Sequence, residues 1–160
     1  MKKFIYIVIL LSGLAVFMAS ARGQEKRKFR PLIAGQFTSS SIVETAKDWE
    51  GRHYRYGQSR QCANWVGEVA TSSGFSLPSG HSMARSWLVG WGESVNLSSI
   101  RPGDVVITWR GSRGGSSGHI LIYLGENQCI HRPTRSSPVR RISLDRYRGK
   151  ILGIRRPTRK

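Results

Sequence analysis

One cysteine and two histidines have residue types and spacing suited to nucleophilic chemistry. Cys62 follows a turn rich in glycine and aromatic residues, and it begins a segment whose apolar residues recur at helical spacing. His119 and His131 lie far downstream in two segments with strand-like patterns. A helix N-terminus and a nearby imidazole both lower the pKa of a thiol and favour the nucleophilic thiolate. The sequence therefore predicts Cys62 as a nucleophile and His119 as its base.

A base of this kind needs a polar neighbour that holds its tautomer and orientation. If the strands pair around the turn at residues 125–127, His131 reaches the same end of the sheet as His119. We therefore expect His131 to orient His119. Thr134 and Asp145 remain open as alternatives for that role.

The residues around the predicted thiol suggest an oxyanion site and a substrate contact surface. The backbone N–H of Cys62 and a tyrosine hydroxyl could donate to the developing oxyanion. Tyr54 is the favoured tyrosine and Tyr56 the alternative, while Gln61 and Asn64 flank the thiol and are expected to contact substrate. No metal-ligand cluster accompanies these residues in the sequence, so this chemistry needs no metal or other cofactor.

Cysteine usage leaves a rival interpretation open. The chain has two cysteines, Cys62 and Cys129, and an oxidising compartment would favour a disulfide between them. Cys129 precedes His131 by two residues and should share its strand face, because side chains alternate along a strand. The context favours a reactive Cys62 and a buried Cys129 thiol, with the bridge as the alternative.

The pattern of apolar residues predicts helices first and strands afterwards. Helices are expected at about 42–49 and 62–73, a short helix within 81–91, and strands at 105–109, 119–124, 128–132, 139–142 and 150–155. This order indicates an α+β fold in which N-terminal helices pack on an antiparallel meander.

The N-terminal residues have the pattern of a secretory signal peptide. Lys2 and Lys3 precede an apolar run over 4–18 and a small-residue site, so cleavage after Ala21 or Gly23 is expected, with a membrane anchor as the alternative. We then expect a basic arm over 22–40, one catalytic domain over 41–157 and a basic tail over 158–160. The predicted location is extracellular.

The excess of basic residues is a second feature of the sequence that bears on function. The chain carries 26 Lys and Arg against 9 Asp and Glu, and residues 101–160 hold 14 of the basic residues and 3 of the acidic ones. Such a surface attracts polyanions over long range. Outside a cell, the candidate partners are bacterial walls with anionic polymers, lipid headgroups, heparin-like sugars and stray nucleic acid. No specific nucleic acid is expected. A merely solubilising surface is the alternative.

Several motifs resemble the NlpC/P60 superfamily of cell-wall peptidases. They are the stretch from Tyr54 to Cys62, RPGD at 101–104, and GHILIYLG at 118–125 with the following Ile-His pair. The resemblance implies a papain-like fold and assigns the catalytic positions to Cys62, His119 and His131. A closer likeness is to type VI secretion amidase effectors and the secreted, domesticated amidase effectors of ticks, through QCANWVG at 61–67, SMARSWLVGWG at 82–92 and GIRRP at 153–157.

One departure from the family pattern lies beside the thiol. The family usually has Asp before the cysteine and Ser-Gly after it, whereas this chain has Gln61, Ala63 and Asn64. The substrate preference of the broad family is therefore not transferred to this chain.

The resemblance implies a secreted antibacterial peptidoglycan amidase. It implies hydrolysis beside meso-diaminopimelate, with the D-Ala–diaminopimelate crosslink favoured and the D-Glu–diaminopimelate bond as the alternative. Expected partners are peptidoglycan, an anionic bacterial surface and an immunity-type protein inhibitor, and the chain is expected to be a monomer. The alternative function, which rests on charge alone, is a non-catalytic cationic antimicrobial binder.

Overall fold

Two helices form where apolar side chains recur at helical spacing. The computed structural model describes residues 39–54, 61–109 and 118–158, and in these α1 spans Ser39–Asp48 and α2 spans Gln61–Ser72. Gly74 ends α2 with a positive φ of 81°, and the Phe75 N–H donates to the Ala70 carbonyl. Both predicted helices are confirmed, although α1 begins about three residues earlier than expected.

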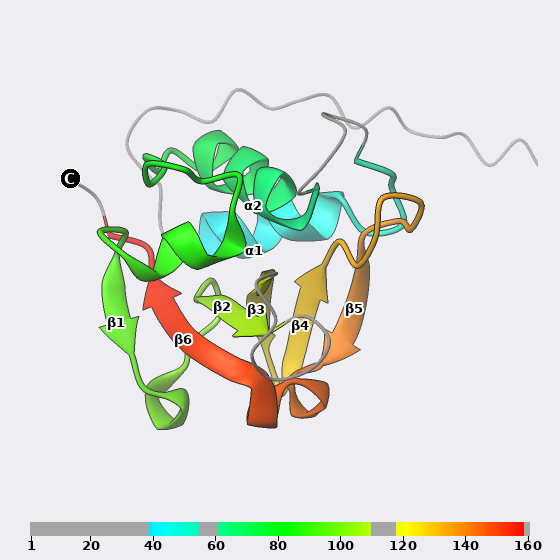
Figure 1. Cartoon of the computed structure of the whole chain (residues 1–160). Coiled ribbons are helices and arrows are strands. Elements are labelled where there is room, and N and C mark those ends of the chain that lie inside the picture. The colour runs from blue at the N-terminus through cyan, green and yellow to red at the C-terminus, as the bar shows by residue number, and fades with distance from the viewer. Residues whose placement is uncertain (1–38, 55–60, 110–117, 159–160) are drawn as a thin grey trace, which may run out of the picture. The chain divides into compact units, whose positions relative to one another are not determined.

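The strands form one antiparallel sheet (Figure 1). Its six strands run in the order β1-β6-β2-β3-β4-β5. Their bounds are Glu93–Val95 for β1, Val105–Trp109 for β2, Gly118–Gly125 for β3, Gln128–His131 for β4, Arg140–Ser143 for β5 and Ile151–Arg156 for β6. The short helix expected within 81–91 is the 3-10 helix η1, Ala84–Leu88. The predicted α+β class is confirmed.

The strand order differs from a simple meander. Strands β2 to β5 follow one another, but β6 returns to pair with β2 on one side and with β1 on the other. The sequence pattern missed β1, which is three residues long and has no buried residue. Its pairing with β6 depends on a long-range contact that no local pattern encodes.

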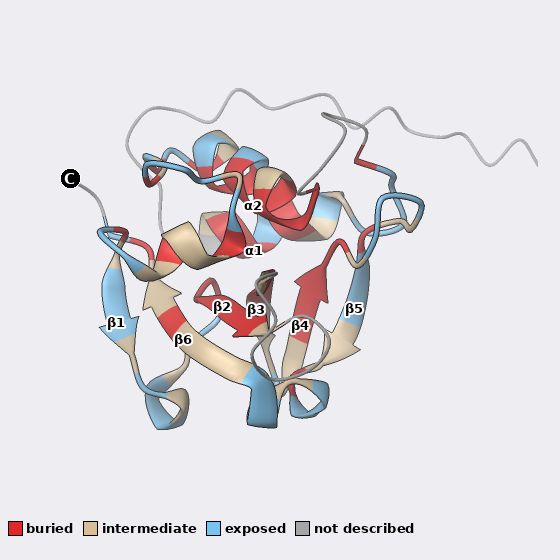
Figure 2. Cartoon of the chain, viewed as in Figure 1, coloured by how far each residue is buried: buried red, intermediate tan, exposed pale blue. Residues whose placement is uncertain are grey.

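The two faces of the sheet carry separate apolar clusters. Ile107, Ile120 and Ile130 belong to the cluster that includes side chains of α1 and α2. Alternate residues such as Val106 and Leu121 belong to a second cluster with Leu144 and Tyr147. Figure 1 shows both α-helices on the same side of the sheet, and Figure 2 shows the buried residues concentrated where helices and sheet meet. Alternation of apolar residues along β2, β3 and β4 therefore creates both clusters.

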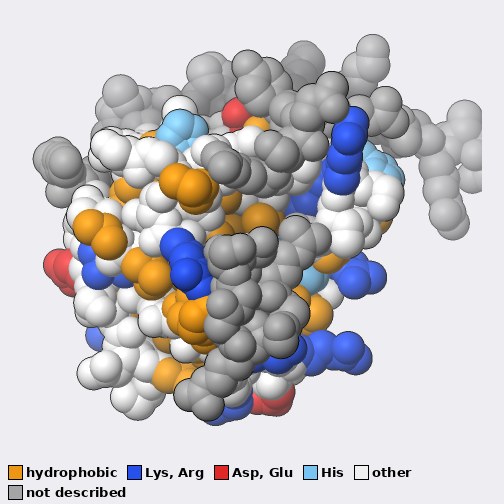
Figure 3. Space-filling model, in the orientation of Figure 1, with side chains coloured by type: hydrophobic (Ala, Val, Ile, Leu, Met, Phe, Trp, Pro, Cys, Tyr) orange, Lys and Arg blue, Asp and Glu red, His pale blue; other side chains and the backbone are white. Residues whose placement is uncertain are grey.

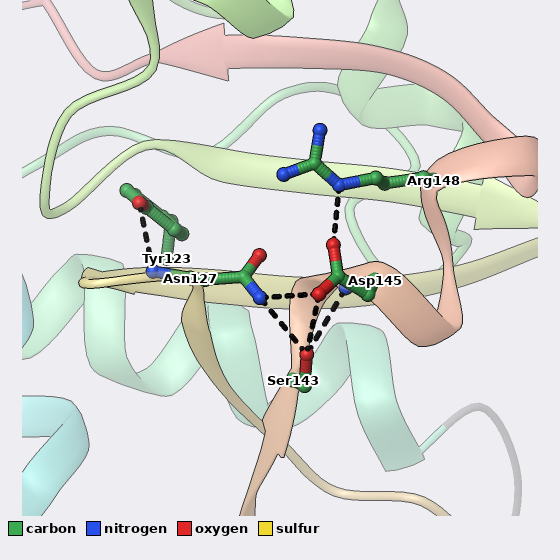
Figure 4. Close-up of polar contacts among 5 residues, drawn as sticks. All are labelled: Tyr123, Asn127, Ser143, Asp145 and Arg148. Atoms are coloured by element: carbon green, nitrogen blue, oxygen red, sulfur yellow. Dashed lines mark hydrogen bonds and ion pairs between the residues drawn. The ribbon is translucent and has the colours of Figure 1, made fainter.

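A tight turn joins β3 to β4 and sets their register. Glu126 and Asn127 both have positive φ, 49° and 59°, as a two-residue hairpin turn requires. The Asn127 amide donates to Ser143 and Asp145, and Asp145 also accepts from Arg148 (Figure 4). This network attaches the turn to the segment that follows β5.

A buried carboxylate fixes the start of β2 to the end of β6. Asp104 is fully buried and accepts from Arg156 through both oxygens, each at 2.9 Å, and from the Arg101 backbone N–H at 2.8 Å. Bidentate contacts of this kind define geometry strongly. They fix the strand β6, whose place in the sheet the sequence did not predict.

The predicted signal peptide, most of the basic arm and the last two residues of the tail lie outside the described residues. None of the helices in 39–54, 61–109 and 118–158 has the length and apolar character needed to cross a membrane.

Asp104→Asn should destabilise the fold. Loss of the carboxylate charge leaves the guanidinium of Arg156 without its anionic partner, which costs about 3 kcal/mol of unfolding free energy. The control is Glu44→Gln in the exposed Glu44–Lys47 pair, where a change below about 0.5 kcal/mol is expected. Urea unfolding measures both, and equal effects of the two substitutions would contradict this interpretation.

Candidate active site

The predicted nucleophile lies in the first turn of α2. Gln61 begins the helix and Cys62 follows it, with 6% and 9% of their surfaces exposed. The N-terminal end of a helix carries a partial positive charge, which stabilises a thiolate placed there. α2 packs against β3, the strand that begins with Gly118 and His119.

The two predicted histidines form a buried pair. His119 Nε2 and His131 Nδ1 lie 2.7 Å apart, within hydrogen-bonding distance. His119 is 4% exposed and His131 is 1% exposed. The Tyr147 ring contacts both imidazoles, with centroid distances of 5.9 and 6.1 Å. The hairpin thus brings together two imidazoles that the sequence placed at the same end of the sheet.

Burial keeps one member of the pair neutral. Desolvation, assisted by the nearby charge of Arg140, lowers the pKa of His131 from 6.5 to about 4. At neutral pH His131 therefore has one N–H and one lone pair, so it can act as a hydrogen-bond acceptor as well as a donor.

The structure distinguishes among the three candidates for orienting His119. His131 makes the contact described above, whereas Thr134 is exposed and bonds to Ser137, and Asp145 belongs to the network in Figure 4. Both alternatives are occupied elsewhere. His131 is the candidate that the fold brings to His119.

Tyr54 packs beside the first turn of α2. It is 4% exposed, and its hydroxyl donates to the backbone carbonyl of Asn64 at 3.4 Å. Trp49 packs edge-on against its ring with a centroid distance of 5.6 Å. Asn64 itself is half-buried. The other predicted oxyanion residue, Tyr56, lies outside the described residues.

Cys129 and Cys62 belong to different apolar clusters of the core. The two cysteines, both in the described part of the chain, form no disulfide. Cys129 is fully buried in the cluster on the sheet face away from α1 and α2, and burial raises the pKa of its thiol to about 12. The structure thus supports the interpretation in which Cys129 is a buried thiol.

Two residues at this end of the fold escaped the sequence analysis. Arg132 directly follows His131 and is 1% exposed, although arginine is rarely buried. Tyr147 reaches the histidine pair from the short helices after β5. The only sequence signal for Arg132 was its position beside His131, and no local pattern pointed to Tyr147.

The described motifs match one family of proteins. A model of the NlpC/P60 family matches residues 51–156, which is well over half of the chain. The chain belongs to the NlpC/P60 family. The matched region includes Cys62, His119 and His131 and ends with β6.

Similar proteins agree with this assignment to the NlpC/P60 family. The murein DD-endopeptidase MepS/murein LD-carboxypeptidase of Escherichia coli K12 is 31% identical over 117 residues, which are 70% of this chain and 58% of that protein. The chain thus spans less than two thirds of this curated relative.

Solved NlpC/P60 structures share the fold. A family member from Bacillus cereus has a TM-score of 0.63 at 22% identity, covering 75% of this chain and 40% of its own. NlpC2 from Trichomonas vaginalis has a TM-score of 0.61 at 20% identity, covering 81% and 49%. These likenesses confirm the predicted papain-like fold. The likeness to type VI and tick amidase effectors remains a prediction.

The buried histidine pair should make stability depend on pH. Because the pKa of His131 falls from 6.5 to about 4 on folding, the unfolded chain binds a proton there that the folded protein does not. The free energy of unfolding therefore has its full value, as far as His131 is concerned, above about pH 6.5. It falls by roughly 3 kcal/mol as the pH is lowered to about 4. Urea unfolding across this pH range should show that the free energy of unfolding depends less on pH in His131→Gln than in the wild type. An unchanged dependence would contradict the assignment.

Proposed function

We propose that this chain is a cysteine peptidoglycan hydrolase that cleaves amide bonds in wall peptides. The observation that carries the proposal is the buried His119–His131 contact between β3 and β4, because the cysteine-bearing helix α2 packs against β3. Membership of the NlpC/P60 family supports it, as does the murein endopeptidase name of the Escherichia coli relative.

In this mechanism His131 selects the tautomer of His119. Neutral His131 accepts at Nδ1 from the Nε2–H of His119, which makes His119 Nδ1 the proton-accepting atom. His119 then takes the proton of the Cys62 thiol, and the imidazolium that forms keeps its Nε2–H bonded to His131. The pair therefore stabilises the thiolate–imidazolium state.

The bond changes follow those of thiol hydrolases. The Cys62 thiolate adds to the scissile carbonyl carbon, and the oxyanion accepts from the Cys62 backbone N–H and from the Tyr54 hydroxyl. Tyr54 would exchange its long bond to the Asn64 carbonyl for this one. His119 protonates the leaving amine, and water then hydrolyses the thioester with His119 as base.

The proposed scissile bond is the D-Ala–meso-diaminopimelate crosslink. That bond joins two D-centres, and the Escherichia coli relative is named a DD-endopeptidase. The D-Glu–diaminopimelate bond is the alternative. Gln61 and Asn64, which flank the thiol, are proposed to contact the wall peptide.

The basic surface is proposed to hold the enzyme on an anionic wall. The net charge is +17, and basic side chains clearly outnumber acidic ones on the face in Figure 3. Long-range attraction of this kind raises the rate of encounter with a polyanion. With the proposed secretory leader at 1–21, this supports an extracellular antibacterial role, and the proposed partners include a protein inhibitor of the immunity type. The same charge favours the second candidate function, a non-catalytic cationic binder.

Cys62→Ala should abolish hydrolysis while leaving wall binding intact. Removal of a nucleophile costs about three orders of magnitude in rate or more, and alanine fits the helix and its apolar surroundings. The measurement is mass spectrometry of muropeptides from purified diaminopimelate-type wall. Cys129→Ala is the matched control, and it should retain activity because Cys129 is a fully buried thiol on β4 that belongs to another apolar cluster than Cys62.

The product masses identify the bond. Cleavage of the crosslink converts dimeric muropeptides to monomers with addition of water, whereas cleavage at D-Glu releases diaminopimelate-containing peptides. Bacterial killing that is equal for wild type and Cys62→Ala, with no change in muropeptides, would overturn the proposal in favour of the cationic binder.

A further inference from the structure

Arg132 has a charged side chain that is buried in the fold, and the proposed mechanism gives this charge no role. It follows His131 at the end of β4, is 1% exposed, and ranks among the largest fully buried side chains of the described residues. Figure 2 shows that β4 is buried over its second half and at its C-terminal end. The guanidinium therefore lies inside the fold rather than on the basic surface.

The hydrogen-bond partners of this guanidinium in the described part of the chain are neutral groups. Its Nε donates to the Thr134 carbonyl at 3.2 Å and its Nη2 to the Arg135 carbonyl. Its Nη1 is buried and has no hydrogen-bond partner among the described residues. No ion pair found within 39–54, 61–109 and 118–158 involves Arg132. The charge is thus held without a carboxylate from this part of the chain.

Such an arrangement is costly for a fold. A buried charge without a counter-ion destabilises a protein by several kcal/mol, and an apolar side chain of similar volume often replaces it without loss. Burial lowers the pKa of Arg132, yet an arginine stays protonated at any physiological pH. Bonds to two loop carbonyls do not require a full charge. A function of the charge itself is the remaining explanation.

The neighbours of Arg132 connect it to the proposed thiol. Its guanidinium carbon lies 5.9 Å from the centre of the Tyr54 ring, and the Tyr54 hydroxyl bonds to the Asn64 carbonyl, two residues after Cys62 on α2. On the other side, Arg132 is bonded covalently to His131. The positive charge is therefore next to the proposed oxyanion donor, on a residue that adjoins the histidine pair in sequence.

We propose that Arg132 is a positioning residue whose fixed positive charge stabilises the Cys62 thiolate and the substrate oxyanion. It acts through Tyr54, whose ring it contacts, and through the electric field at the start of α2. This inference rests on the proposed function of Cys62 as the nucleophile. It explains why the fold retains, next to His131, a buried charge that has no counter-ion among the described residues.

Among the described residues, the other charges on α2 and on the elements that pack against it are poor substitutes for this one. The titratable side chains on α2 and on the elements that pack against it are Glu68, Glu44, Lys47, Asp48, His119 and Tyr123. His119 is the buried member of this set, whereas the three carboxylates are exposed, and Glu44 pairs with Lys47. Arg140, which lowers the pKa of His131, is itself exposed to solvent.

The test measures the reactivity of Cys62 without any wall substrate. Iodoacetamide alkylation of Cys62 is followed by mass spectrometry between about pH 3.5 and 9. Arg132→Met should move the midpoint of reactivity upward by on the order of one pH unit, because the thiolate loses a neighbouring positive charge. Arg132→Lys, which keeps the charge, should stay close to wild type.

Matched variants separate charge from packing. Arg101→Met removes an exposed charge before β2, near the end of the sheet away from His119, and should leave the midpoint unchanged. Arg132→Gln retains donors for the two loop carbonyls and should shift the midpoint as Arg132→Met does, which keeps the test valid if the methionine variant fails to fold. Cys129, fully buried, is the unreactive internal reference.

The outcomes distinguish this inference from the proposed function. A midpoint that is the same in wild type and in the neutral variants, even with reduced wall hydrolysis, would overturn the inference and leave Arg132 with a packing role. A shifted midpoint supports it, also if wild type fails to cleave peptidoglycan. In that case the proposed substrate is wrong, while the electrostatic role of Arg132 stands.

Discussion

The hydrogen bond between His119 Nε2 and His131 Nδ1 is the interaction on which the site depends. At 2.7 Å it requires β3 and β4 to keep one register, which the two-residue turn at Glu126 and Asn127 sets. It also requires burial, because a solvated His131 would titrate near neutral pH and lose its acceptor lone pair. Hairpin geometry and desolvation together allow a neutral His131 to accept from His119, and the proposed general-base chemistry requires the tautomer of His119 that donates in this bond.

The aliphatic core and the candidate site occupy different parts of the sheet. The middle of β2 and β3 consists of fully buried aliphatic side chains, and the Asp104–Arg156 contact fixes β6 beside them. The end of β4 instead holds a neutral histidine of low pKa, and the next residue is a buried arginine without an ion pair in 39–54, 61–109 and 118–158. The buried charge weakens the fold, and the histidine weakens it further below about pH 6.5, so the aliphatic core must supply the stability that this end lacks.

Much of the site was predictable from the sequence, because its parts lie on elements with strong local patterns. Helical spacing after Cys62 and strand patterns at His119 and His131 placed all three residues on the correct elements. The position of β6 between β1 and β2 was missed, since pairing between strands far apart in sequence has no local signature. Arg132 was missed for another reason: its polarity predicts a surface position, and only the fold shows that it is buried.

The protonation of the histidine pair is the most direct test of the account. Long-range proton–nitrogen NMR spectra of the side chains in the folded protein at neutral pH report which ring nitrogens carry hydrogen. The account predicts His119 protonated at Nε2 with a bare Nδ1, and His131 protonated at Nε2 with a bare Nδ1 that accepts from His119. A proton on His131 Nδ1, donated to His119 Nε2, would contradict it, because His119 would then lack the lone pair that takes the proton of Cys62.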